Sequence, residues 1–144
     1  MTFIALLLLS LHAEGSSLDL TNWVGKYPHD TDKDGLTLFQ VPAVHAALSH
    51  LLKRREMKLL TKTYIVSSRI SLIQGFLVVQ RCMPHCCPCA HVMLAIDLKD
   101  GRFHIGFYDH KSERVTIKWI SSEGEFQNLP KEIQDEFYHG HNPR

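Results

Sequence analysis

All four cysteines of the chain lie in one stretch of eight residues, Cys82-Met83-Pro84-His85-Cys86-Cys87-Pro88-Cys89. Cysteines gathered this closely either tie a loop together with disulfide bonds or bind a metal ion. The 144-residue chain is long enough for one domain with a core of its own. The two interpretations of the cluster give different functions, and the rest of the sequence has to decide between them.

A metal site would have enough ligands within ten residues: Cys82, His85, Cys86, Cys87, Cys89 and His91. Structural zinc sites, however, usually take their four ligands as two pairs from separate parts of the chain. Residues 86–89 also fit a Cys-x-x-Cys redox motif, but such motifs accompany a βαβ unit, which this sequence does not show. A zinc-binding or thiol-redox module built on residues 82–91 is therefore the alternative. Neither a metal nor a cofactor is expected.

Disulfide bonds are the favoured interpretation, and four cysteines allow three pairings. A bridge between Cys86 and Cys87 would distort the peptide between them. A bridge between Cys82 and Cys87 would close a six-residue ring with Pro84 and His85 at its tip. The loop-entropy model gives so small a ring about 2 kcal/mol of stability. The larger effect is on shape, because each side chain fixed before binding avoids about 0.5–1.5 kcal/mol of ordering cost.

Charge and motifs narrow the class of protein. Sixteen Lys and Arg residues against fifteen Asp and Glu leave a net charge of +1. This balance argues against a nucleic-acid-binding protein, which usually has a strongly basic face. The sequence shows no Ser/His/Asp order, no phosphate-binding glycine loop and no clear pair of carboxylates, so we expect a binding protein and not an enzyme.

The first fifteen residues have the features of a signal peptide. Residues 3–9 are an uninterrupted apolar run, far shorter than the roughly 20 residues that cross a bilayer. Small residues at 13–15 suit cleavage, and clustered cysteines suit an oxidising compartment. We expect residues 1–15 to be removed and residues 16–144 to act as a single domain, periplasmic or secreted, without contact to a membrane.

The apolar pattern predicts an α+β domain. A longer helix is expected from Pro42 to the basic residues 53–55, because apolar residues recur there at helical spacing. A short closing helix is expected over residues 130–138. Strands are expected at residues 64–66, 71–81, 91–98, 103–107 and 115–120. Short turns join them into a central antiparallel sheet of about five strands, against which the helices pack. The cysteine stretch then forms a loop at one end of this sheet.

The segment Cys82-Met83-Pro84-His85-Cys86-Cys87 resembles the Cys-Lys-Pro-His-Asp-Cys loop of the inhibitor of vertebrate lysozyme (Ivy) family. The similarity covers about residues 60–125, including the strand at 92–96, Gly106-Phe107-Tyr108 and the strand that ends near Trp119. Residues 23–28 are similar to more distant bacterial members. Two positions depart from the family loop: Met83 stands where the family has Lys, and Cys86 where it has Asp.

The resemblance implies a periplasmic inhibitor of C-type lysozyme whose loop enters the cleft of the enzyme. The family's histidine contacts the two catalytic carboxylates, and by position His85 takes this role. The resemblance also implies a disulfide between Cys82 and Cys87, which leaves Cys86 and Cys89 for a second one. The expected partner is a C-type lysozyme, and a homodimer is left open.

Overall fold

The computed structural model describes residues 18–111, 113–122 and 125–139. The expected signal peptide, residues 1–15, lies outside the described residues. In chain order the elements are η1 (Thr21–Trp23), η2 (Leu38–Gln40), α1 (Pro42–Leu51), α2 (Arg54–Lys58), η3 (Leu59–Thr63), β1 (Val66–Ser67), β2 (Ser71–Ile73), β3 (Phe76–Cys82), β4 (Ala90–Asp97), β5 (Phe103–Lys111), β6 (Arg114–Ser121), η4 (Phe126–Asn128) and α3 (Lys131–His139).

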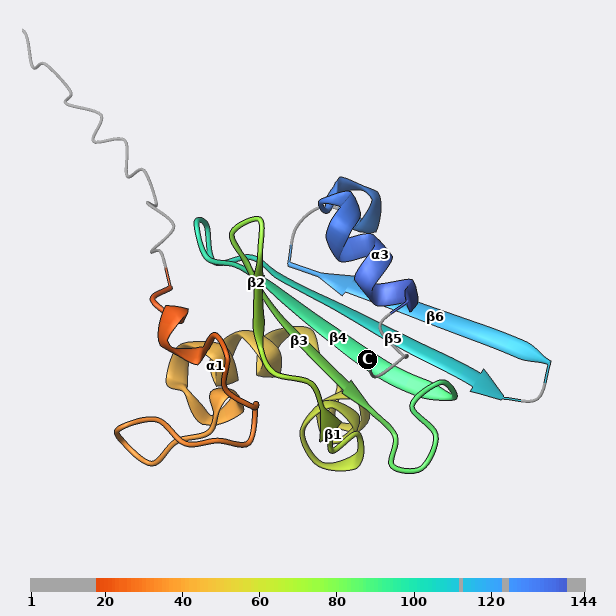
Figure 1. Ribbon diagram of the computed structural model, residues 1–144, viewed down its shortest axis with the longest axis horizontal. Helices are drawn as coiled ribbons and strands as arrows, with labels where there is room; N and C mark the ends of the chain where they lie inside the picture. Colours follow the sequence, from red (N-terminus) through yellow and green to blue (C-terminus); the bar gives the residue numbers. More distant parts are fainter. Residues whose placement is uncertain (1–17, 112, 123–124, 140–144) are drawn as a thin grey trace, which may run out of the picture.

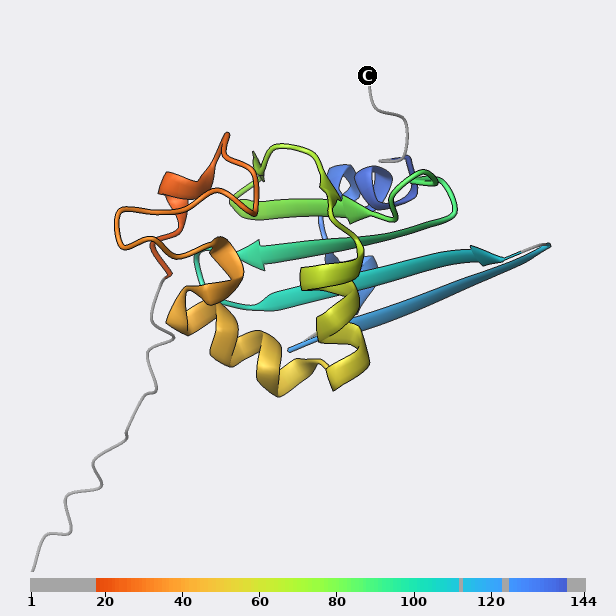
Figure 2. The same cartoon turned by 90° about the horizontal axis from the view of Figure 1, so that it is seen from below.

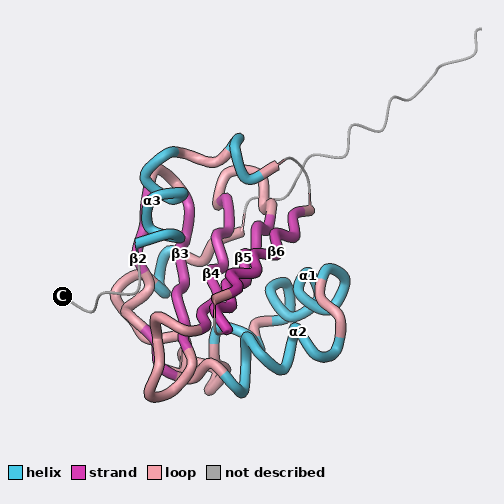
Figure 3. The backbone as a smooth tube through the Cα atoms, turned by 90° about the vertical axis from the view of Figure 1, so that its right-hand side faces the viewer, coloured by secondary structure: helices cyan, strands magenta, loops and turns pink. Residues whose placement is uncertain are grey.

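The strands form one antiparallel sheet, and the predicted α+β class is confirmed. The strand order is β1-β3-β4-β5-β6, and β2 also pairs with β3. Figure 1 shows α3 on one face of this sheet, and Figures 2 and 3 show α1 and α2 on the other. The three-layer arrangement follows from the sequence pattern, because the central strand β4 is buried along almost its whole length and needs cover on both faces.

Three element boundaries differ from the sequence-based prediction. Residues 71–81 form a hairpin and not one strand, because Gln74 and Gly75 both have positive φ and turn the chain back. The strand expected at 64–66 is only Val66–Ser67. The first helix ends at Leu51, so the basic residues 53–55 do not end that helix and instead begin α2.

Each face of the sheet has its own apolar core. The larger core lies under α1, α2 and the N-terminal segment and includes Leu38, Val44, Leu48, Leu60, Leu77, Val79, Val92, Leu94 and Ile105. The smaller core lies under α3 and includes Val78, Met93, Ala95, Leu129, Ile133 and Phe137. Burying each large apolar side chain stabilises the fold by about 1.5–3 kcal/mol. The two cores together hold the sheet rigid between the helices.

Glu56 joins α2 to the sheet. Its carboxylate accepts a hydrogen bond from the backbone N–H of Lys53 at 2.8 Å and forms an ion pair with Lys118 of β6. Burial raises the pKa of Glu56, but the hydrogen bonds and charges of Lys118 and Lys53 outweigh burial, so the pKa is lowered. The pair therefore stabilises the fold at neutral pH, and this contribution is lost as the pH falls through the lowered pKa.

No helix among the described residues is long and apolar enough to cross a membrane.

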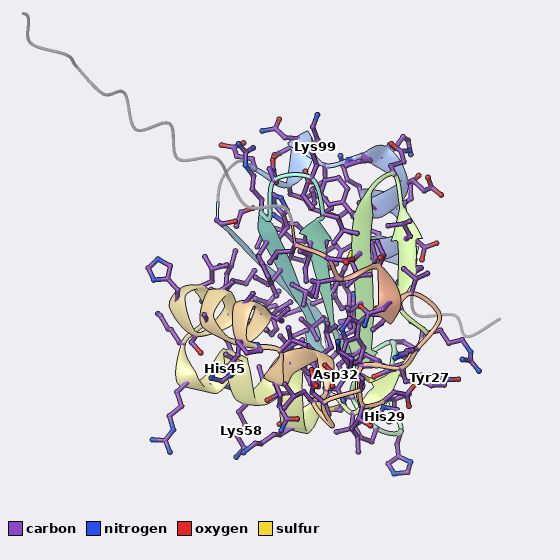
Figure 4. The ribbon with its side chains drawn as sticks, turned by 90° about the vertical axis from the view of Figure 1, so that its left-hand side faces the viewer. Tyr27, His29, Asp32, His45, Lys58 and Lys99 are labelled. Atoms are coloured by element: carbon purple, nitrogen blue, oxygen red, sulfur yellow. A yellow bond between two sulfur atoms is a disulfide. The ribbon has the colours of Figure 1, made fainter. Side chains whose placement is uncertain are left out.

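Tyr27, His29 and Asp32 lie on the N-terminal loop, and Lys99 lies in the turn between β4 and β5 (Figure 4). This turn follows the end of β4, whereas the cysteine loop precedes its start. Lys99 therefore marks the end of the sheet opposite the cysteines.

A glycine in β5 fixes the position of α3. Gly106 pairs with Trp119, and the Trp119 ring packs edge-on against Phe126 and Phe137 at centroid distances of 4.4 and 5.5 Å. A Cβ at Gly106 would overlap the Trp119 ring and lie 2.6 Å from the Phe137 ring. Only a glycine therefore lets these aromatic rings lie directly on the strand.

We expect Gly106→Ala to lower the free energy of unfolding by about 1–3 kcal/mol, the usual cost of overpacking. Urea denaturation measures this change. The same substitution in a Trp119→Leu background is expected to cost less, because the smaller side chain leaves room for the methyl group. Wild-type stability in Gly106→Ala would contradict the packing described.

Candidate functional site

The cysteine stretch forms the loop 83–89, which connects β3 to β4. β3 and β4 pair as an antiparallel ladder whose last pair is Cys82 with His91. Beyond it, the N–H of Met83 donates to the carbonyl of Ala90 at 2.9 Å. The ladder thus continues one step beyond the strands. The loop is a direct extension of the two most central strands, and the sheet fixes the direction in which it projects.

The first half of the loop is a tight turn with His85 near its tip. The N–H of Cys86 donates to the carbonyl of Met83 at 3.2 Å, so residues 83–86 form a β-turn. Pro84, whose φ is fixed near −65°, is followed by His85 at a φ of 66°. Proline followed by a residue of positive φ is the pattern of a type II turn. That position is usually glycine or asparagine, and a histidine there adopts an uncommon backbone conformation.

The second half of the loop is another turn, and disulfide bonds hold both turns closed. The N–H of Cys89 donates to the carbonyl of Cys86 at 3.0 Å. Cys82 is bonded to Cys87 and Cys86 to Cys89, with Cα atoms 4.8 and 5.2 Å apart. The first is the pair that the resemblance implied, and the second joins the two cysteines that it left over. Because each bridge begins or ends inside the ring of the other, neither turn can open without straining the other.

The loop exposes very little besides the histidine. Among residues 82–89, only His85 and Pro88 are exposed, and the others are half-buried. Met83 packs against the larger core. The loop therefore presents the His85 imidazole and Pro88 on a closed backbone, while its other side chains are half-buried.

Arg81 supports the base of the loop and was not predicted from the sequence. It is buried beneath η2 and η3, where its guanidinium donates to the Leu60 carbonyl at 2.7 Å and to Ser67 Oγ at 3.0 Å. It also lies over the Phe39 ring, 5.3 Å from its centroid. Burial lowers the pKa of Arg81, but an arginine stays charged in proteins. These contacts fix β3 at the residue before Cys82.

The start of β4 is held from the other face. His91 is buried, stacks on Tyr108 at a centroid distance of 4.5 Å, and donates from Nε2 to the carbonyl of Phe137 in α3 at 3.1 Å. The N–H of His110 in β5 donates to the carbonyl of Cys89 at 2.6 Å. The second half of the loop is thus anchored on β5, and α3 covers its base.

A metal centre does not form around the cysteines. All four sulfurs are in disulfides, and the described residues contain no group of three or more His, Cys, Asp and Glu side chains placed to hold a metal ion. The structure places His91 beneath α3, whereas His85 is on the exposed tip. The zinc alternative therefore has no support among the described residues. The Cys86–Cys89 bridge joins a loop between two antiparallel strands, and not the βαβ unit that accompanies a thiol-redox motif.

A second buried histidine lies away from the loop. His104 in β5 is hydrogen-bonded through Nδ1 to Ser121 Oγ and packs near Phe76. Burial lowers the pKa of His104 and outweighs the opposing effect of Asp97 and Asp100. A neutral imidazole with a hydroxyl partner is a satisfied core histidine, and we assign it no role in binding.

The chain belongs to the inhibitor of vertebrate lysozyme (Ivy) family, whose family model matches residues 43–140. The match includes the whole sheet, α3 and the cysteine loop. Searches of curated proteins and of solved structures find no match. The suspected family is thereby confirmed.

The cysteine pairing predicts which thiol appears when one partner is removed. In Cys86→Ser, labelling with a maleimide under non-reducing conditions should modify Cys89, and in Cys82→Ser it should modify Cys87. Mass spectrometry of labelled peptides locates the modification. The wild-type chain is the control and should take no label, being lighter than its reduced form by four hydrogens, two for each bridge. Label on Cys82 or Cys87 in the Cys86→Ser variant would contradict the pairing.

Proposed function

We propose that this protein is an exported inhibitor of C-type lysozyme and that it acts by inserting residues 82–87 of the cysteine loop into the active-site cleft. Membership in a family of lysozyme inhibitors supports the partner. The observation that carries the mode of binding is the exposed, left-handed His85 at the tip of a doubly bridged loop. The protein acts as a binding protein in the periplasm or outside the cell.

The chemistry of the target fits an imidazole. Retaining glycosidases such as lysozyme work with two carboxyl groups about 5 Å apart. A protonated imidazole donates from both ring nitrogens, and neighbouring carboxylates favour that charged form. One His85 ring can therefore hydrogen-bond to both groups and exclude the water and the sugar that they act on. Because the ring carries no glycosidic bond, the enzyme cannot turn it over.

The rigidity of the loop explains why it can compete with substrate. Most of its ordering entropy has been lost on folding, so binding avoids about 0.5–1.5 kcal/mol for each side chain that is already fixed. The aspartate and lysine of the family loop are absent here. In their places Cys86 closes the second bridge and Met83 packs on the core. We infer that this chain orients its histidine by covalent and apolar contacts.

The imidazole is tested by replacing His85 with asparagine, which tolerates a positive φ and so leaves the turn intact. Loss of the central contact is expected to weaken inhibition of a hen-type lysozyme by about 2–4 kcal/mol, or roughly 30- to 1,000-fold in the inhibition constant. A turbidity assay with bacterial cells measures it.

His45→Asn is the matched control, because His45 is an exposed histidine on α1, away from the loop (Figure 4). This variant should inhibit as the wild type does. If His85→Asn and His45→Asn inhibit equally well, His85 is not the inhibitory residue.

A further inference from the structure

Exposed apolar side chains gather around the cysteine loop. Seven large apolar residues are exposed among residues 18–111, 113–122 and 125–138. Two of them lie away from the loop. Leu72 pairs with Leu77 near the start of β3, and Val24 precedes Gly25, whose N–H donates to the carbonyl of Ile70 just before β2. The other five are Ile65, Val66, Val115, Ile117 and Tyr138, each between 44% and 54% exposed.

The pairing of the strands places these residues on both sides of the loop. Val66 pairs with Cys82, and Ile117 pairs with Tyr108. Since Cys82 pairs with His91, and His91 with Tyr108, one row runs straight across the sheet from Val66 to Ile117. Residues paired directly opposite each other share a face, so this row lies on the face that α3 covers.

The row spans five strands, which at 4.8 Å between neighbours is about 19 Å. Val115 lies two residues beyond Ile117 in the direction of the loop, and Tyr138 comes from the last turn of α3. Ile65 directly precedes Val66, and both lie on the side of the loop away from Val115. Figure 1 shows β1 on one side of the loop and the β5–β6 hairpin on the other, at the same end of the sheet. We call these five residues the apolar collar.

We propose that the apolar collar is a second contact surface for lysozyme, meeting the rim of the cleft on either side of the inserted loop. This inference rests on the proposed function. A stable interface buries about 800 Å² on each partner and uses about 20–30 residues a side. The loop has seven residues, most of them half-buried, and cannot supply that area. The surface continuous with it has to supply the rest.

Charge supports an apolar contact over an ionic one. The net charge of +1 provides little electrostatic steering toward any charged partner, so affinity has to come from contact. Contacts that surround a central anchor exclude water from it, and apolar side chains on both sides of the loop suit this role. Excluding water would also strengthen the hydrogen bonds of His85 to carboxylates, because these are stronger in a low-dielectric environment.

The test uses two pairs of substitutions and a matched control pair. Ile65→Thr/Val66→Thr and Val115→Thr/Ile117→Thr remove apolar surface from either side of the loop, while threonine keeps the branched shape that suits a strand. Val24→Thr/Leu72→Thr does the same away from the loop at similar exposure, 40% and 49%. Each collar pair is expected to raise the inhibition constant about 5- to 20-fold. The control pair is expected to change it less than about twofold.

Calorimetry at several temperatures supplies a second readout. Apolar burial makes the heat-capacity change of binding negative, so both collar pairs should make it less negative while His85→Asn should leave it nearly unchanged.

If the wild type inhibits, His85→Asn weakens inhibition and the collar pairs behave as the control pair, the collar proposal is overturned and the proposed function stands. If the wild type does not inhibit, the proposed function fails first. A third outcome also overturns the collar proposal: the wild type self-associates, and the collar substitutions dissociate it without changing inhibition. The collar would then bind a second copy of this chain.

Discussion

The left-handed backbone of His85 is the constraint on which the site depends. A residue with a Cβ costs about 1–2 kcal/mol in this conformation, and it persists only where the surroundings leave no alternative. Here Pro84 precedes it, a hydrogen bond closes the turn, and two interlocked disulfides flank it. The loop thus holds a single histidine outward at a small energetic cost, which the covalent framework offsets.

The disulfide-bonded loop keeps its position because the sheet beneath it is rigid. The central strand β4 is covered by a core on each face. Arg81 fixes the end of β3 from one side, and His91 ties the start of β4 to α3 from the other. Gly106 leaves room for the Trp119 and Phe137 rings to pack directly on β5, which keeps α3 in place. Features far from the tip therefore determine how well His85 is positioned.

The sequence predicted the fold class, the loop between two strands and the family, because these follow from alternating apolar residues and from a short motif. It could not show Arg81 turning inward, since an arginine in a strand is normally exposed and its partners lie in segments distant along the chain. It could not show the left-handed Gln74 that splits one strand into a hairpin. The apolar collar was also out of reach, because strand pairing alone brings Val66 beside Cys82 and Ile117 beside Tyr108.

The central claim is that the His85 loop and a carbohydrate substrate occupy the same site on lysozyme. The most direct measurement is the apparent dissociation constant of this protein for a hen-type lysozyme at rising concentrations of a chito-oligosaccharide that fills the cleft. Mutually exclusive binding predicts that the apparent constant rises in proportion to the oligosaccharide concentration. A dissociation constant that does not change when the cleft is saturated with sugar would contradict the account, because this protein would then bind elsewhere on the enzyme.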